Sequence, residues 1–437
     1  MAVKIVRQLK KIALIGAPSS AAAFSAGTEK APAALRAAGL VERLQNAGYE
    51  VIDYGDCPPR MFADDDEHRR ARNLPAIVAG LNDLKVHVEV ATKSGALVLV
   101  LGGDCAQSVG LISGARRYYK HLNLLWFDRD ADLNTPATTP SGRIDGMVVA
   151  HIIGKGAPEL VRFWGEPPLV REPDITLFGI ERLDPPEQDL LNKSPLRCVL
   201  ASTIQSKGAA AAAKNALTNL HADAREFILH LDLDVIASDD LLAVNVPGTG
   251  GLRFDEVRAA LTQFLSSKNL LGLDIAQFNP DKDPDGSSAR KIVDLLVEVL
   301  TTRLNTESAP AEAPSTATSA PPEAAAGSPV FESPISKLPE PEHFPAAPEE
   351  PTLEERHHKH PAAAELPATD SAASAPEPVS VDPSVASLES AAEPGSADRA
   401  PTEPETSATS HDEIPDDADE SKEVRSSENA RGASSDS

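Results

Sequence analysis

The sequence has few of the residues that mark secreted or membrane proteins. Its 437 residues include three cysteines, Cys57, Cys105 and Cys198. They form no CxxC pair and no disulfide framework, which suits a reducing compartment and predicts a cytoplasmic protein. No apolar run approaches the ~20 residues that span a bilayer, so no membrane partner is expected.

The amino-terminal segment superficially resembles a signal peptide, because the basic stretch MAVKIVRQLKK precedes the apolar IALIGA. The apolar run is short, and Gly16 and Pro18 interrupt it. We therefore expect residues 12–15 to form the first strand of the fold.

Positive charge is in deficit, with 41 Lys and Arg against 66 Asp and Glu and a net charge of −25. The deficit is concentrated at one end. Residues 304–437 contain 7 basic and 28 acidic residues. Residues 1–303 therefore contain 34 basic and 38 acidic residues and are nearly balanced in charge. Neither part has the basic surface that nucleic-acid binding requires, so no nucleic-acid partner is predicted.

The acidic segment 304–437 also has too few apolar residues to form a core. It holds 20 of the 37 prolines, no Trp or Tyr, and two aromatic residues, Phe331 and Phe344. Such a segment cannot offset chain entropy of roughly 1–2 kcal/mol per residue. We predict one folded domain over residues 1–303 and a disordered acidic tail over 304–437, whose partner is unknown.

Apolar runs alternate with helical patterns between residues 11 and 303, which is typical of a mostly parallel sheet covered by helices on both faces, a three-layer α/β domain. Strands are expected at residues 11–15, 51–54, 96–101, 124–127, 175–180, 197–202, 227–231 and 271–277. Helices are expected at residues 31–47, 72–93, 106–119, 208–220, 254–267 and 287–303.

Two of the predicted strands end in clustered aspartates. Asp128, Asp130 and Asp132 follow one apolar run, and Asp232 and Asp234 follow another. Ligands bind outside the carboxyl ends of such strands, so five carboxylates are expected to share one crevice. Clustered negative charges repel one another and resist desolvation, so protons or cations must balance them.

The motifs around these strands resemble the arginase or ureohydrolase superfamily. In order along the chain they read IGAP, GTEKAPAALRAAGL, GGDCAQS, WFDRDADLNTPATTPSG, HLDLDV, NVPGTGG and GLDIAQFNPDKDPDG. The resemblance implies an eight-stranded sheet, two manganese ions, and hydrolysis of a guanidino or amidine C–N bond in an arginine-like small molecule. It also implies a homo-oligomer.

The resemblance implies a metal site with altered ligands. Asp128, Asp132, Asp232 and Asp234 match four carboxylate ligands of the family. Cys105 stands where the family motif GGDH has a histidine ligand, and Asp130 stands where D-A-H-x-D has the second one. We take all six residues as candidate ligands.

Two catalytic positions depart from the family as well. Asp145 replaces a histidine that assists proton transfer, and we take Asp145 and the metal-site residue Asp132 as the catalytic candidates. Gln277 replaces a carboxylate that holds the substrate's guanidinium group, so that contact loses its charge assistance.

The residues expected to contact the α-carboxylate and α-amino groups of the substrate differ less from those of the family. Asn134, Thr135 and Ser141 match the loop that contacts the substrate's α-carboxylate. Asp184 and Glu187 match the positions that face its α-amino group. These five residues and Gln277 are the candidate substrate-binding residues.

Two interpretations of the altered centre remain open. In the first, metals persist, with Asp130 as an oxygen ligand and Cys105 as a poor partner for hard ions. In the second, the guanidinium groups of Arg129 and Arg143 replace the metals. The first predicts a metal-dependent ureohydrolase. The second predicts a non-catalytic pseudoenzyme that acts as an amino-acid-binding or scaffold protein.

We expect His151 and His230 to be packed or hydrogen-bonded side chains rather than ligands. The thiol of Cys105 is expected to be an inert buried group, because no histidine follows it in a nucleophile motif.

Overall fold

The computed structural model describes residues 5–308, and these residues form an eight-stranded sheet in which each pair of neighbouring strands is parallel. The order of strands is β2-β1-β3-β8-β7-β4-β5-β6. The strands are β1 (Lys11–Ala17), β2 (Glu50–Asp56), β3 (Leu97–Gly102), β4 (Asn123–Phe127), β5 (Ile175–Ile180), β6 (Arg197–Leu200), β7 (Phe227–Asp232) and β8 (Leu270–Ala276).

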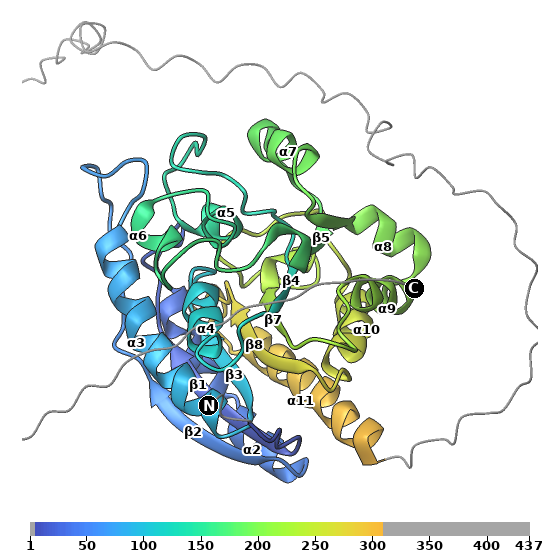
Figure 1. The fold of residues 1–437 in the computed structure, drawn as a ribbon. Coiled ribbons are helices and arrows are strands. Elements are labelled where there is room, and N and C mark those ends of the chain that lie inside the picture. The colour runs from blue at the N-terminus through green and yellow to red at the C-terminus, as the bar shows by residue number, and fades with distance from the viewer. Residues whose placement is uncertain (1–4, 309–437) are drawn as a thin grey trace, which may run out of the picture. The chain divides into compact units, whose positions relative to one another are not determined.

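Helices cover both faces of the sheet, which gives three layers (Figure 1). The helices are α1 (Ala31–Ala37), α2 (Leu40–Asn46), α3 (Leu74–Lys93), α4 (Gln107–Ala115), α5 (Val148–Ile152), α6 (Pro158–Val161), α7 (Pro185–Asn192), α8 (Ala201–Lys207), α9 (Ala209–Asn219), α10 (Phe254–Leu265) and α11 (Ser287–Ser308). The three-layer α/β prediction with an eight-stranded sheet is confirmed.

Two apolar cores lie against the sheet. Alternate strand residues face opposite layers: Leu125 belongs to the core on the side of α1, α2 and α8 to α11, whereas Leu124 and Trp126 belong to the core on the side of α3 to α6. This two-sided burial accounts for the continuous apolar runs of the central strands.

The topology brings the ends of four strands together. After β3 the chain crosses to β4, β5 and β6, and returns through β7 and β8, which lie between β3 and β4. The carboxyl ends of β3, β8, β7 and β4 are therefore neighbours, although the segments are far apart in sequence. Each of these ends carries a candidate site residue.

Some expected elements differ in their limits. The helix expected at residues 31–47 is two helices, because Gly39 adopts a φ of 86° between them. The strand expected to reach Ser202 ends at Leu200, where α8 begins. Helix α11 continues past Arg303 to Ser308, because Leu304 still packs in the core. Residues 309–437, to which most of the predicted tail belongs, lie outside the described part of the chain.

Among residues 5–308, no helix is long and apolar enough to cross a bilayer.

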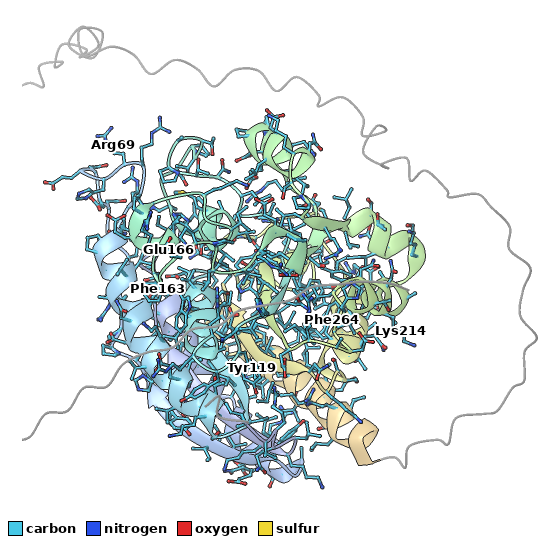
Figure 2. All side chains as sticks on the ribbon, in the orientation of Figure 1. Arg69, Tyr119, Phe163, Glu166, Lys214 and Phe264 are labelled. Atoms are coloured by element: carbon cyan, nitrogen blue, oxygen red, sulfur yellow. The ribbon has the colours of Figure 1, made fainter. Side chains whose placement is uncertain are left out.

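The aromatic cluster beneath α10 provides a test of the packing. Phe264 is fully buried and makes edge-to-face contacts with Phe127 and Phe178, at ring-centroid distances of 5.8 and 5.1 Å (Figure 2). Phe264→Ala is expected to lower the free energy of unfolding by about 3–5 kcal/mol in urea titrations, because it leaves a cavity. Phe24→Ala, at a side chain that is 43% exposed, is the control. Equal losses in the two variants would contradict this packing.

Candidate metal centre

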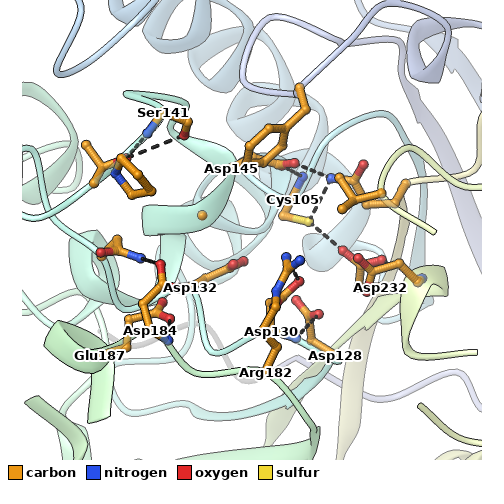
Figure 3. Close-up of a pocket in the computed structure, with 18 residues that line it drawn as sticks. Cys105, Asp128, Asp130, Asp132, Ser141, Asp145, Arg182, Asp184, Glu187 and Asp232 are labelled. Atoms are coloured by element: carbon orange, nitrogen blue, oxygen red, sulfur yellow. Dashed lines mark hydrogen bonds and ion pairs between the residues drawn. The ribbon is translucent and has the colours of Figure 1, made fainter. Parts of the chain in front are cut away.

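The carboxyl ends of β3, β4, β7 and β8 form the floor of a cavity of about 250 Å³ (Figure 3). Of the thirteen residues predicted for the site, Thr135 alone does not line the cavity; it bonds Thr138 instead. The twelve that line it are Cys105, Asp128, Asp130, Asp132, Asn134, Ser141, Asp145, Asp184, Glu187, Asp232, Asp234 and Gln277.

The two acidic strand ends fold in the same way. The backbone N–H of Asp130 donates to Asp128 Oδ1 at 2.8 Å, and the N–H of Asp234 donates to Asp232 Oδ1 at 2.7 Å. Each carboxylate thus closes a local turn over its own strand end. The alternate spacing of aspartates in the sequence is the signature of this turn.

Two site residues have a backbone conformation that is uncommon for residues other than glycine. Asp132 has a φ of 50° and Gln277 a φ of 68°. Such conformations cost energy and persist where the surrounding structure imposes them. Here they occur where the chain leaves β4 and β8 and places both side chains in the cavity.

Burial and mutual repulsion raise the pKa values of the clustered carboxyls. The pKa values of Asp128, Asp132 and Asp232 lie well above the ordinary range, first because of desolvation and then because of the neighbouring carboxylates. Desolvation and repulsion from Asp130 raise the pKa of Asp234 to about 7, although Arg129 and Arg182 oppose the shift. The cluster therefore favours protons or cations over free negative charge.

Cys105 lies within this acidic group. Its thiol donates to Asp232 Oδ2 at 3.0 Å and accepts from Gln277 Nε2 at 3.2 Å. Burial, followed by repulsion from Asp145 and Asp232, raises the pKa of the thiol well above its ordinary value. Without a cation the group is thus a neutral thiol rather than a nucleophile.

Asp145 and Gln277 form a hydrogen-bonded pair. The side-chain amide of Gln277 donates to Asp145 Oδ2 at 2.5 Å, and the backbone N–H of Cys105 donates to Asp145 Oδ1 at 2.9 Å. Desolvation, with a contribution from Asp104, raises the pKa of Asp145 to about 7. A carboxyl with such a pKa can hold or release a proton near neutral pH.

Arginines neutralise the outer end of the cluster. Arg182 forms a bidentate ion pair with Asp130, with both N–O distances at 2.6 Å. Arg129 lies 3.5 Å from Asp234 and donates to the backbone oxygen of Val246.

Arg143 does not contribute to this neutralisation. It points away from the cluster, pairs with Asp64, donates to Ala63 O and stacks on Phe62. The structure therefore contradicts the part of the second interpretation in which Arg143 replaces a metal. Arg182 is the arginine that reaches the cluster, since the chain after β5 brings its guanidinium group beside Asp130.

The residues predicted to bind the amino-acid part of the substrate form hydrogen bonds with one another and with the nearby backbone. Asn134 Nδ2 donates to Asp184 Oδ2 at 2.9 Å. Glu187 caps α7 by accepting from the backbone N–H of Asp184, and it also accepts from the N–H of Leu133. Desolvation raises the pKa of Glu187 to about 7. Both of its oxygens thus hold the loop in place, while the hydroxyl of Ser141 accepts from the N–H of Arg143.

Comparison with known proteins identifies the family. The family model described as "Arginase family" matches residues 10–301. The chain belongs to the arginase family. It is 29% identical to the arginase of Bacillus caldovelox over 292 residues, which are 66% of this chain and 97% of that protein. It is 30% identical to the arginase of Bacillus subtilis over 296 residues, which are 68% and 99% of the two chains.

Solved structures agree with this assignment. The crystal structure of arginase from Bacillus cereus superimposes with a TM-score of 0.62 at 30% identity and covers 67% of this chain and 98% of that chain. A structure of the Bacillus caldovelox arginase gives a TM-score of 0.63 at 28% identity. The arginase fold therefore accounts for the part of the chain that precedes the acidic segment.

The arginase family implies a metal centre, and the donor atoms of this chain fit a divalent cation. Two groups of side chains could each hold a cation, because the ligand atoms within each group lie within 4.8 Å of one another. The outer group consists of Asp128, Asp130 and Asp234, and the inner group consists of Cys105, Asp128, His230 and Asp232. Asp132 Oδ2 and Asp234 Oδ1 are buried and have no hydrogen-bond partner among the described residues. Buried oxygens without donors are suited to a cation.

Two residues at the candidate centre, Arg182 and His230, were not among the residues predicted for the site. Arg182 belongs to the RLDPPE motif, but its pairing with Asp130 depends on the path of the chain after β5. His230 was expected to be packed, and it is, yet it also belongs to the inner ligand group. Its signal was its position two residues before Asp232, which places both side chains on the same face of β7.

The arginine at the outer group is expected to compete with a cation. Arg182→Met should strengthen binding of Mn²⁺ to the outer group by about tenfold or more in calorimetric titration, because it frees both oxygens of Asp130 and removes a positive charge. Tenfold corresponds to about 1.4 kcal/mol. Arg36→Met, which breaks a bidentate pair with Asp53 on the surface, is the control. Unchanged affinity in Arg182→Met would contradict the competition.

Proposed function

We propose that this protein is a metal-dependent hydrolase that cleaves the C–N bond of a guanidino or amidine group in a small, arginine-like molecule. The observation that carries the proposal is the set of buried aspartates at the adjoining ends of β4 and β7. Two of them, Asp132 and Asp234, have an oxygen with no hydrogen-bond partner among the described residues. Keeping these acids buried has a cost, and a bound divalent cation removes it.

The chemistry divides between the cation and the side chains. A divalent cation, when bound, lowers the pKa of water and polarises the bond under attack. Asp145 is the candidate proton carrier, because its Oδ2 faces Gln277 inside the cavity and its pKa is about 7. Gln277 fixes the orientation of Asp145, and its Oε1, which has no partner among the described residues, can accept from a substrate N–H. Asp132, with a free buried oxygen, is the second candidate for the catalytic machinery.

The cavity favours a small cationic substrate. A volume of about 250 Å³ suits a molecule the size of an amino acid, and the lining is rich in carboxylates. Ser141 and Asp184 stand at the end away from Cys105 (Figure 3), and Asn134 is bonded to Asp184. These three side chains could contact the amino-acid part of the substrate. Glu187 would act there by holding the loop rather than by touching the substrate.

The identity of the metal, the assembly and the location are also proposals. Mn²⁺ suits the outer group, whose ligand atoms are all oxygens. We further propose a homo-oligomer, by analogy with the family, and a cytoplasmic location, because Cys57, Cys105 and Cys198 are free thiols.

One observation favours a second candidate function, that of a non-catalytic protein which binds an amino acid or acts as a scaffold. The ion pair between Arg182 and Asp130 occupies both oxygens of a candidate ligand, and Arg129 lies beside Asp234. Guanidinium groups can neutralise carboxylates but cannot activate water. If they neutralise the whole cluster, the pocket could persist without hydrolysis.

The deciding experiment measures bound metal and urea release together. The full chain would be supplied with Mn²⁺ or Zn²⁺, analysed for metal, and assayed with arginine and agmatine. Turnover that disappears in Asp232→Asn and persists in Asp174→Asn would support the hydrolase; Asp174 pairs with Arg171 and Arg225 away from the cavity. A folded, metal-loaded protein with no release of urea or an analogous product from either substrate would overturn it in favour of the binding protein.

A further inference from the structure

His230 is held rigidly below the cavity. It is fully buried on β7, and its ring stacks on Trp126 at a centroid distance of 3.7 Å. Its Nδ1 lies 2.7 Å from Asp274 Oδ2 and 2.9 Å from Ser108 Oγ. One edge of the ring is therefore fixed by a carboxylate, which is the arrangement that orients histidines bound to metals.

The other ring nitrogen, Nε2, is buried and has no hydrogen-bond partner among residues 5–308. The second buried histidine of the fold differs. His151 uses both nitrogens, since its Nδ1 contacts Met147 O at 2.6 Å and its Nε2 accepts from the N–H of Ala157 at 3.0 Å. A buried nitrogen left without a partner destabilises the fold, unless something outside the polypeptide binds it.

A ring nitrogen of His230 lies close to three other donors. Together with Cys105 Sγ, an oxygen of Asp128 and an oxygen of Asp232, it forms a group whose atoms lie within 4.8 Å of one another. All four residues are at least nine-tenths buried. Because Nδ1 is already bonded to Asp274, Nε2 is the nitrogen free to bind a cation.

We propose that His230 is a metal ligand and that the inner group, Cys105, Asp128, His230 and Asp232, holds one cation of intermediate softness, such as Zn²⁺. The proposal rests on that part of the proposed function which places a divalent cation in this cavity. The ligand set does not follow from the arginase family, whose two histidine positions are Cys105 and Asp130 here. His230 supplies an imidazole from a third position.

The donor chemistry determines the class of metal. A thiolate, an imidazole and two carboxylates form a four-coordinate set typical of Zn²⁺ and of its spectroscopic substitute Co²⁺. Mn²⁺ and Mg²⁺ prefer sets made of oxygen alone. Binding would displace the thiol proton of Cys105 into the solvent, so the sulfur would coordinate as a thiolate.

The test uses the full chain, stripped with a chelator and titrated with Co²⁺. The first equivalent is expected to produce a thiolate-to-cobalt charge-transfer band and the visible absorption of a tetrahedral ion. Cys105→Ser should abolish the charge-transfer band and retain binding. Mn²⁺, added in competition, should fail to displace the first equivalent at similar concentrations. A first equivalent without the charge-transfer band, or one readily displaced by Mn²⁺, would overturn the proposal.

The role of His230 has its own test. His230→Gln is expected to weaken binding of the first Co²⁺ by at least about tenfold, whereas His151→Gln, the matched buried control, should leave it unchanged. If His230→Gln fails to fold, the unmodified cobalt protein serves instead. Its proton NMR spectrum should contain a strongly shifted, exchangeable N–H signal from the ring nitrogen bonded to Asp274. Equal affinities in the two variants, or the absence of that signal, would overturn the ligand assignment.

The failure of this proposal and that of the proposed function can be distinguished. Tight cobalt binding with the thiolate band, but no urea release with any metal, would remove the hydrolase and leave the ligand set. Urea release by the manganese-loaded protein, together with a cobalt titration of the same chain that shows no thiolate band, would retain the hydrolase and remove the ligand set.

Discussion

Metal-free protein is expected to lose stability as the pH rises from about 4 to about 7, which is the reverse of the usual behaviour of carboxyl groups. Asp145, Asp234 and Glu187 have folded-state pKa values of about 7, above ordinary values of 3.8 for the aspartates and 4.5 for the glutamate. Over that range the folded state retains protons that the unfolded state has released. The stabilisation is complete below the unfolded pKa and is lost as the pH passes the folded pKa.

The magnitude of this effect is large for so few groups. Each such carboxyl contributes on the order of 3 kcal/mol, because one pKa unit corresponds to 1.36 kcal/mol. The measurement is urea unfolding of chelator-treated protein across the pH range, with the same series repeated in excess Zn²⁺. The metal should abolish the decline, since a bound cation stabilises the ionised carboxylates. Stability that rises with pH in the chelator series would show that these acids are not held protonated.

The second prediction concerns the pair formed by Asp145 and Gln277. Gln277→Glu places a carboxylate 2.5 Å from Asp145 Oδ2 in a buried site, where the amide now donates. We expect this single change to cost about 3 kcal/mol of unfolding free energy at neutral pH, because it leaves like charges without compensation. The measurement is the urea midpoint of each variant.

Adding Asp145→His should reverse that loss, since an imidazole can donate to the new carboxylate. The double variant has a histidine and a glutamate at the positions where the resemblance implies them. We expect it to recover the stability of the parent protein, with a favourable coupling between the two changes at least as large as the loss of about 3 kcal/mol in Gln277→Glu, and to increase urea release from arginine. Losses that simply add in the double variant would mean that the two positions are not a functional pair.

The sequence predicts the architecture because the pattern of apolar residues within each strand agrees with the way in which the whole sheet is buried. Runs such as Leu124 to Phe127 are apolar on both faces, and only a sheet covered on two sides buries both. The helix limits were less predictable. Gly39 lies inside a continuous amphipathic pattern, and only the left-handed backbone there divides α1 from α2.

The candidate site was predictable where its residues follow strands directly. Asp128 and Asp232 belong to a repeated strand-end turn, so their convergence follows from the parallel sheet. Side chains that reach the cluster from elsewhere were not predictable in this way. Arg143 has the right position in the motif but points to Asp64, whereas Arg182 reaches Asp130 through the approach of two loops.

The proposed ligand His230 could not be predicted from the sequence for a different reason. A histidine inside an apolar strand is ordinarily a packed side chain, and its contacts with Trp126 and Asp274 fit that expectation. Only the pattern of hydrogen bonds shows that one nitrogen is satisfied and the other is not. Such an imbalance depends on neighbours from three different elements, and the sequence does not reveal it.

The most direct test of the central claim, that a cation balances the converging acids, is a metal analysis of the full chain purified without chelator. The account predicts at least one tightly held divalent ion per chain, retained through dialysis and lost in Asp232→Asn. A folded chain that carries no divalent ion, and whose unfolding midpoint does not change when Zn²⁺, Co²⁺ or Mn²⁺ is added, would contradict it.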